Sequence, residues 1–216
     1  MTTLLSFNPR ILYHKNIDQI TSQEYKLQIT DTLSNLYIDS PYAKILLNKL
    51  IFFNDRIIFM NKDPSPYISI TTIYPKIIYP TRNHGFGDVL IIVLPPFYEG
   101  SIHSINPLKN EGERNKVLID KIYKNIPLRK PIDNDTFEKF KIIKKKVHFK
   151  IYLVHELLHA YHYLYNTPFE NKKEELEPAI IYGLEKYPIN HENKKIYITE
   201  NRIRSDLGLY PRISYN

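Results

Sequence analysis

The pattern of apolar and polar positions predicts both helices and strands. A helix is predicted for Pro41–Leu50, because Ser40 can cap it and proline is favoured at a first helical position. The segment 56–60, which is apolar after Arg56, and the alternating segment 68–74 have strand character, and the unbroken apolar run at 89–94 predicts a buried strand. Helices and short strands in this order indicate the α+β fold class.

The remaining segments carry weaker patterns. Residues 1–30 predict irregular structure with a short strand at 11–14, and we interpret them as a flexible N-terminal region used in secretion. Residues 95–131 combine proline, glycine and mixed charge, which predicts a long surface connection with a short helix at 114–124. Residues 136–165 predict one long helix, basic in its first half and apolar in its second.

Composition limits the class of protein. The 216 residues fit one domain or at most two small ones, and we expect a single domain over 1–216. The absence of cysteine excludes disulfides and thiolate metal ligands, and it suits a protein that unfolds for export. The net charge of +7 is spread without an arginine-rich run, so we expect a soluble chain steered toward acidic partners rather than a nucleic-acid binder. No apolar run of about eighteen residues predicts a membrane span.

The segment 155–164, HELLHAYHYL, carries the strongest chemical signal. His155 and His159 are four residues apart, so on a helix they share one face about 6 Å apart along the axis, and their imidazoles can meet one metal ion. Glu156 leans toward the same side, within reach of a water molecule on that metal. This is the H-E-x-x-H pattern of zinc proteases, with two ligands and a general base.

Two plainer interpretations compete with a metal site. Chance produces about 0.02 such matches in a chain of this composition. The second is a buried helix whose histidines only satisfy neighbouring groups. Apolar residues surround the motif almost completely, which predicts a helix through the core, where polar groups need partners or a metal ion. His162 lies about 10 Å from His155 along such a helix, so we interpret it as a packing or hydrogen-bonding residue.

A third ligand is expected downstream, because a catalytic zinc usually has three protein ligands and one position open for water. The segment 174–183, EELEPAIIYG, offers three glutamates. We favour Glu177, since Pro178 after it suits a first helical turn and the following apolar residues can turn it inward. Glu175 is only the second choice. It follows two lysines, so we expect its side chain to be solvated. Each glutamate alone is more often a surface charge, and weaker candidates are Glu185, His191 and Glu192.

Further motifs follow in order along the last third of the chain. Glu200 stands twelve residues before Arg212, and Arg212 with Tyr215 forms an R-x-x-Y pattern. Together with HELLHAYHYL and the acidic 174–183 segment, this set resembles the NleD-like zinc metalloproteases, effectors injected into host cells by type III secretion. It is also similar to the catalytic core of clostridial neurotoxin light chains. Several motifs in one order are far more specific than H-E-x-x-H alone.

The resemblance implies a fold and a metal site. The fold would be a single zincin-like domain of the gluzincin type, with a small mixed sheet and a central H-E-x-x-H helix. His155, His159 and Glu177 would hold Zn²⁺, and Glu156 would be the general base. The metal would lower the pKa of a bound water and polarise the scissile carbonyl.

The resemblance also implies roles for residues near the C-terminus. Glu200 would orient a ligating histidine, as metal-site histidines usually require. Arg212 and Tyr215 would point at the reacting carbonyl, and a cation with a phenol hydroxyl suits oxyanion stabilisation. Independently of the resemblance, Thr199 can cap a short helix that ends near Gly208, which places Glu200 in its first turn. Without the motif, the plain interpretation is that Arg212 is a surface cation and Tyr215 one of eighteen tyrosines, near a frayed terminus.

The expected function is that of a zinc-dependent endopeptidase, a bacterial effector or toxin secreted to act in the host cytosol. By resemblance, its substrates would be host mitogen-activated protein kinases, each bound as an extended strand against an edge strand. The alternative is a non-catalytic, zinc-stabilised binding protein that acts on an acidic host partner. A bound metal that keeps a water ligand would distinguish them, because structural zinc sites are closed. The oligomeric state does not follow from the sequence.

Overall fold

The computed structural model shows a mixed α+β protein, as predicted, with six α-helices and small sheets among the residues it describes. These are residues 6–15, 20–64, 75–80, 88–96, 98, 100–105, 112–123, 127–130, 132–133, 142–166 and 173–213. The chain divides into two compact units. The first unit comprises Met1–Ile38, Leu46–Glu99 and His148–Thr167, and the second comprises Asp39–Ile45, Gly100–Val147 and Pro168–Asn216.

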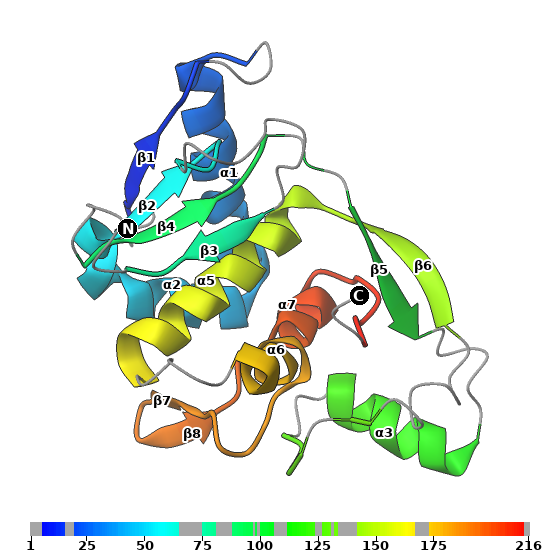
Figure 1. Ribbon diagram of the computed structural model, residues 1–216. Coiled ribbons are helices and arrows are strands. Elements are labelled where there is room, and N and C mark those ends of the chain that lie inside the picture. The colour runs from blue at the N-terminus through cyan, green and yellow to red at the C-terminus, as the bar shows by residue number, and fades with distance from the viewer. Residues whose placement is uncertain are drawn as a thin grey trace. The chain divides into compact units, whose positions relative to one another are not determined.

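The first unit is built on a four-stranded mixed sheet with strand order β1-β2-β4-β3. The three strands β1, β2 and β4 run parallel, whereas β3 pairs antiparallel with β4 and forms one edge (Figure 1). The central strand β4 is buried along its whole length, which is typical of a strand covered on both faces. The strands span Arg10–Leu12 (β1), Ile57–Met60 (β2), Lys76–Ile78 (β3) and Leu90–Val93 (β4).

Helices cover this sheet. The helix α5 (Phe149–Asn166) packs against β3 and β4, and its apolar residues are buried almost all round. The helix α1 (Ser22–Asp39) begins with a capping box, in which the Thr21 and Glu24 side chains each accept a hydrogen bond from the other residue's backbone N–H. Its buried residues are spaced along one face: Tyr25, Ile29, Leu33 and Leu36. The helix α2 (Pro41–Leu50) leads into a 3₁₀ helix, η1 (Ile51–Arg56).

The second unit combines helices with two antiparallel strand pairs. Strand β5 (Gly100–Ile105) pairs with β6 (Ile142–Val147), and β7 (Ile189–His191) pairs with β8 (Lys194–Ile196). Three helices, α3 (Glu113–Tyr123), α6 (Lys173–Tyr182) and α7 (Glu200–Asp206), complete it, and α7 contacts the other two. Its core is formed by Ile105, Ile119, Ile122, Ile181, Tyr182 and Ile213.

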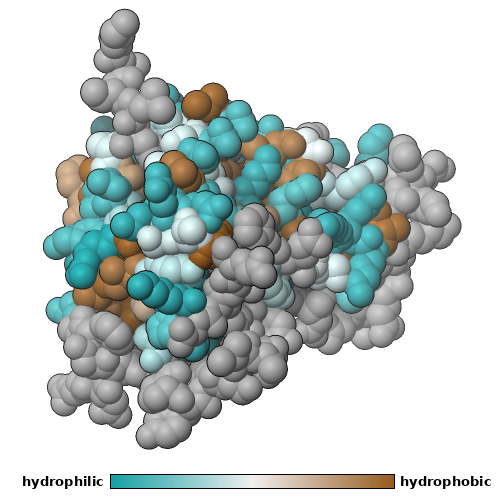
Figure 2. All heavy atoms as spheres, turned by 90° about the horizontal axis from the view of Figure 1, so that it is seen from above, coloured by the Kyte–Doolittle hydropathy of each residue, from teal (hydrophilic) through white to brown (hydrophobic). Residues whose placement is uncertain are grey.

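Exposed apolar residues are scattered over the described surface. On the face seen in Figure 2, small hydrophobic patches are separated by hydrophilic residues. The most exposed large side chains are those of Phe52 and Ile38, and isolated exposures of this kind are normal in folded proteins. Within the described helices, none is both long and apolar enough to cross a membrane.

Several predicted elements are confirmed. The helix at Pro41–Leu50 has the predicted bounds, and Ser40 Oγ accepts a hydrogen bond from the Ala43 N–H at its start. The strands predicted at 56–60 and 89–94 are β2 and β4, each slightly shorter. The helix predicted at 114–124 is α3. The strand predicted at 68–74 lies outside the described residues.

Three predictions are wrong. The single helix over 136–165 does not form, because the described residues 142–147 are strand β6 and the helix begins only at Phe149. Residues 95–131 contain strand β5 as well as the predicted helix. Residues 1–30 contain the start of α1, where only irregular structure and a short strand were predicted. In the first two cases the cause is the pairing of β5 with β6, a long-range contact that no local pattern reveals.

Candidate metal centre

Helix α5 carries the H-E-x-x-H side chains in a buried position. His155, Glu156 and His159 are each at most 5% exposed. The Nε2 atoms of the two histidines lie 3.2 Å apart, and the rings meet edge to face with centroids 4.8 Å apart. One helical turn separates the residues, so both Nε2 atoms face a common point beside the helix. This is the arrangement that two imidazole ligands of one ion require.

Tyr79 contacts the second histidine from the edge of the sheet. It directly follows strand β3, and its hydroxyl oxygen lies 3.1 Å from Nδ1 of His159. Its ring also packs against Tyr163, one helical turn beyond His159, with centroids 5.1 Å apart. Sequence reasoning missed Tyr79, because it is 80 residues from its partner and is one of eighteen tyrosines.

His162 is a buried packing residue, in agreement with the sequence analysis. Its side chain is 2% exposed, and its ring meets that of Tyr161 edge to face. Burial, with a smaller contribution from His159, lowers the pKa of His162 to about 3. The imidazole is therefore neutral at physiological pH.

Glu177 lies on α6, where Leu176 and Ala179 are also buried. Its side chain is 7% exposed, so it is not a solvated surface charge. The predicted position in a first helical turn is wrong, because α6 begins at Lys173 and contains Pro178 in its interior. The side chain of Glu175, the second choice as ligand, lies outside the described residues.

His155, His159 and Glu177 form a group that could hold a metal ion. One ligand atom from each lies within 4.8 Å of the others, and all three side chains are buried. Two imidazole nitrogens and one carboxylate oxygen are among the donor sets that catalytic zinc sites use. The chemistry of the donors therefore fits Zn²⁺.

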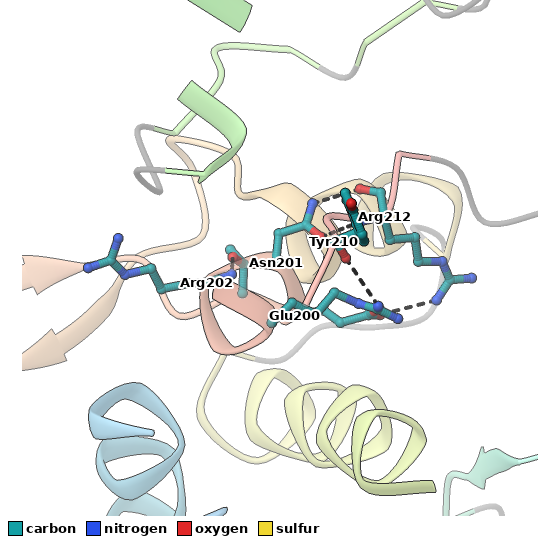
Figure 3. Close-up of polar contacts among 7 residues, drawn as sticks. Glu200, Asn201, Arg202, Tyr210 and Arg212 are labelled. Carbon is teal, nitrogen blue, oxygen red and sulfur yellow. Dashed lines mark hydrogen bonds and ion pairs between the residues drawn. The ribbon is translucent and has the colours of Figure 1, made fainter. Parts of the chain in front are cut away.

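A second polar cluster surrounds helix α7. Thr199 caps the helix as predicted, with its Oγ accepting a hydrogen bond from the Arg202 N–H. The fully buried carboxylate of Glu200 accepts from two guanidinium groups: Arg204 Nε at 2.6 Å and Arg212 Nη1 at 3.1 Å (Figure 3). Arg212 is only 8% exposed, so it is an ion-paired buried residue rather than a surface cation.

The main chain of residue 212 is held by Asn201. The Asn201 Nδ2 donates to the Arg212 carbonyl at 2.7 Å, and the Arg212 N–H donates to Asn201 Oδ1 at 2.6 Å. Arg204 Nη1 also donates to the Tyr210 carbonyl. Helix α7 ends before Gly208, whose φ of +66° is an ordinary conformation for glycine at a helix C-terminus. In Figure 3 Arg202 points away from this cluster.

The structure thus places the predicted site residues in two described clusters. His155, His159 and Glu177 belong to the candidate metal group, and Glu200 and Arg212 belong to the cluster at α7. Tyr215 lies outside the described residues. Their roles as ligands, orienting carboxylate and oxyanion donors stay predictions.

Comparisons with protein-family models, curated proteins and solved structures find no significant match to this chain.

Proposed function

We propose that this chain is a zinc-dependent endopeptidase with a zincin-like fold of the gluzincin type. The observation that carries the proposal is the buried group of His155, His159 and Glu177. The first two belong to an H-E-x-x-H helix, and the third is a downstream helical glutamate, as this class of site requires.

The number of donors favours a catalytic zinc over a purely structural one. Structural zinc sites in proteins are closed by four protein ligands, whereas catalytic sites use three and keep a position open. The described residues supply three donors in this group. Whether a bound ion keeps a water ligand is the test that separates this proposal from the non-catalytic alternative, a zinc-stabilised protein that binds an acidic partner.

The residues suggest how hydrolysis would proceed. Zn²⁺ bound by this group would supply Lewis-acid chemistry, lowering the pKa of a coordinated water and polarising the scissile carbonyl. Glu156 follows the first histidine and is itself buried. Its carboxylate would take a proton from the attacking water and deliver it to the leaving amine. Arg212 and Tyr215 would stabilise the tetrahedral oxyanion.

The edge strand β3 suits the binding of an extended substrate. It is the antiparallel edge of the sheet, and α5 packs against it in the same unit. A peptide can add to such an edge through main-chain hydrogen bonds, while its side chains enter flanking pockets. We further propose a bacterial effector secreted to act in the host cytosol, with mitogen-activated protein kinases as the substrates to test first.

The proposal is tested with the zinc-loaded full chain and its Glu156→Gln variant. Both proteins are incubated with host-cell lysate and with purified mitogen-activated protein kinases, and new protein N-termini are identified by mass spectrometry. We expect cleavage with the wild-type chain only, and equal zinc content in both. The Gln side chain keeps the size of Glu156 but cannot act as a base at neutral pH.

Two results would contradict the proposal. A Glu156→Gln variant that produces the same new termini would remove Glu156 as the base. A wild-type chain that binds no stoichiometric zinc, or a His155→Ala variant that binds zinc as tightly, would remove the metal site itself.

A further inference from the structure

We propose that Tyr79 is a positioning residue for the metal site: its hydroxyl oxygen accepts a hydrogen bond from the Nδ1–H of His159 and so directs the Nε2 lone pair toward the ion. This inference rests on the proposed function, because it requires His159 to be a ligand. It adds a residue from the sheet edge to a site that the sequence assigned to helical and C-terminal segments.

The geometry of His159 separates its two ring nitrogens. Nε2 lies 3.2 Å from Nε2 of His155, and Nδ1 lies 3.1 Å from the Tyr79 hydroxyl. A neutral imidazole carries one proton, so Nε2 can bind a metal ion only if that proton is on Nδ1. The proton then needs an acceptor, because His159 is 4% exposed and water has little access to it. The phenol oxygen of Tyr79 is in place to accept a hydrogen bond from that N–H.

Two contacts fix where that oxygen lies. Strand β3 ends one residue before Tyr79, and its register with β4 pairs Ile78 with Ile91. The Tyr79 ring packs against Tyr163, on the same helix as His159. The strand therefore fixes the position of the Tyr79 backbone, and the contact with Tyr163 fixes the orientation of the Tyr79 ring. The hydrogen bond to this oxygen in turn limits the rotation of the His159 imidazole, because the strand and the Tyr163 ring both fix the position of the oxygen.

The consequence is a coupling between the edge strand and the metal site. Partners that hydrogen-bond to a ligating histidine fix its tautomer and ring orientation, and their loss typically lowers metal affinity or activity 10–100-fold. Tyr79→Phe removes the acceptor oxygen and keeps the ring against Tyr163. We expect zinc affinity to fall by about that factor, while the zinc-free protein loses only the stability that one hydrogen bond contributes.

Tyr165→Phe provides a matched control. The Tyr165 hydroxyl likewise makes a hydrogen bond, which it donates to the Lys49 carbonyl from the end of α5. Its substitution removes a comparable bond in the same unit without touching either histidine. Zinc affinity is measured for wild type, Tyr79→Phe and Tyr165→Phe by competition with a chelator, and thermal unfolding is followed without metal. Only Tyr79→Phe should bind zinc more weakly.

A tautomer measurement on the wild-type protein adds a test whose outcome does not depend on whether any variant folds. In ¹H–¹⁵N spectra of the zinc-loaded wild-type chain, the ring proton of His159 should be on Nδ1 and protected from exchange with water. In Tyr79→Phe that protection should be lost. A purely structural role for Tyr79 would change stability but leave this signal unmoved.

The possible failures are distinguishable. If wild type and Tyr79→Phe bind zinc with equal affinity, or if the Nδ1 proton of the wild type exchanges freely, the inference about Tyr79 is wrong while the metal site stands. If the wild-type chain binds no zinc, the proposed function fails and the inference fails with it.

Discussion

Replacing Asn201 by alanine is expected to lower both the stability of the protein and its turnover. The Asn201 amide makes two short hydrogen bonds to the main chain of residue 212, at 2.6 and 2.7 Å, and its side chain is fully buried. These bonds hold the backbone from which the Arg212 guanidinium extends toward Glu200. Alanine removes both bonds at once.

The magnitude follows from what the substitution leaves behind. One backbone N–H and one backbone carbonyl lose these partners in the interior, and each such group costs about 1–3 kcal/mol. The free energy of unfolding should therefore fall by about 2–6 kcal/mol, a large part of the 5–15 kcal/mol typical of a folded protein. If Arg212 contacts the reacting carbonyl, a displacement of about 1 Å should also lower kcat about 100-fold.

The chain offers a matched control in Asn61. Its amide forms the same pair of bonds with the main chain of His14, at 2.9 and 3.2 Å, and it is also fully buried. Asn61→Ala should lose comparable stability and keep the kcat of the folded protein. Urea unfolding gives the free energies, and peptide cleavage at a temperature where both variants are folded gives kcat. The reasoning is refuted if Asn201→Ala loses less than about 1 kcal/mol, or if its kcat equals that of Asn61→Ala.

Three further predictions concern the other site residues. Glu177→Gln should weaken zinc binding at least about 100-fold, whereas Glu175→Gln should leave it unchanged. Chelator competition measures both affinities, and weaker zinc binding by Glu175→Gln alone would make Glu175 the ligand. Tyr215→Phe should lower kcat about 100-fold with zinc retained, and loss of zinc in that variant would instead make Tyr215 structural or a ligand. Burial lowers the pKa of His162 from 6.5 to about 3 in the folded chain. As the pH falls below 6.5 the unfolded chain therefore binds a proton at this residue before the folded chain does. The contribution of this residue to the free energy of unfolding is then fully present above pH 6.5 and decreases as the pH falls toward 3. In zinc-free protein, His162→Leu should therefore lose less unfolding free energy than wild type between about pH 7 and pH 4, and an equal loss would show that His162 contributes nothing.

The sequence predicted elements whose signals are local. Serine and proline at 40–41 marked the start of α2, and Thr199 marked the start of α7, because capping groups act within three residues. The same rule would have located α1, whose Thr21 and Glu24 form a capping box that the sequence analysis did not use. The H-E-x-x-H spacing predicted that His155 and His159 share a face for the same reason.

Elements and contacts that depend on distant residues were not predictable in this way. Strand β6 carries three consecutive lysines that also suit the exposed face of a helix, but its pairing with β5 makes it a strand. The ammonium group of Lys145 lies over the ring of Tyr210, a contact across 65 positions of the chain. Tyr79 reaches His159 across a similar separation. No periodicity encodes such pairs, because the fold alone brings them together.

The polar groups around α7 have a different character, because their bonds connect close neighbours in the chain. The cap, the two ion pairs of Glu200 and the Asn201 bonds span 3 to 12 residues. Closing loops of this size costs little chain entropy. Closing the loop between Glu200 and Arg212 therefore opposes the formation of these bonds only weakly. The orientation of the Arg212 guanidinium therefore depends on bonds within one short segment of the sequence.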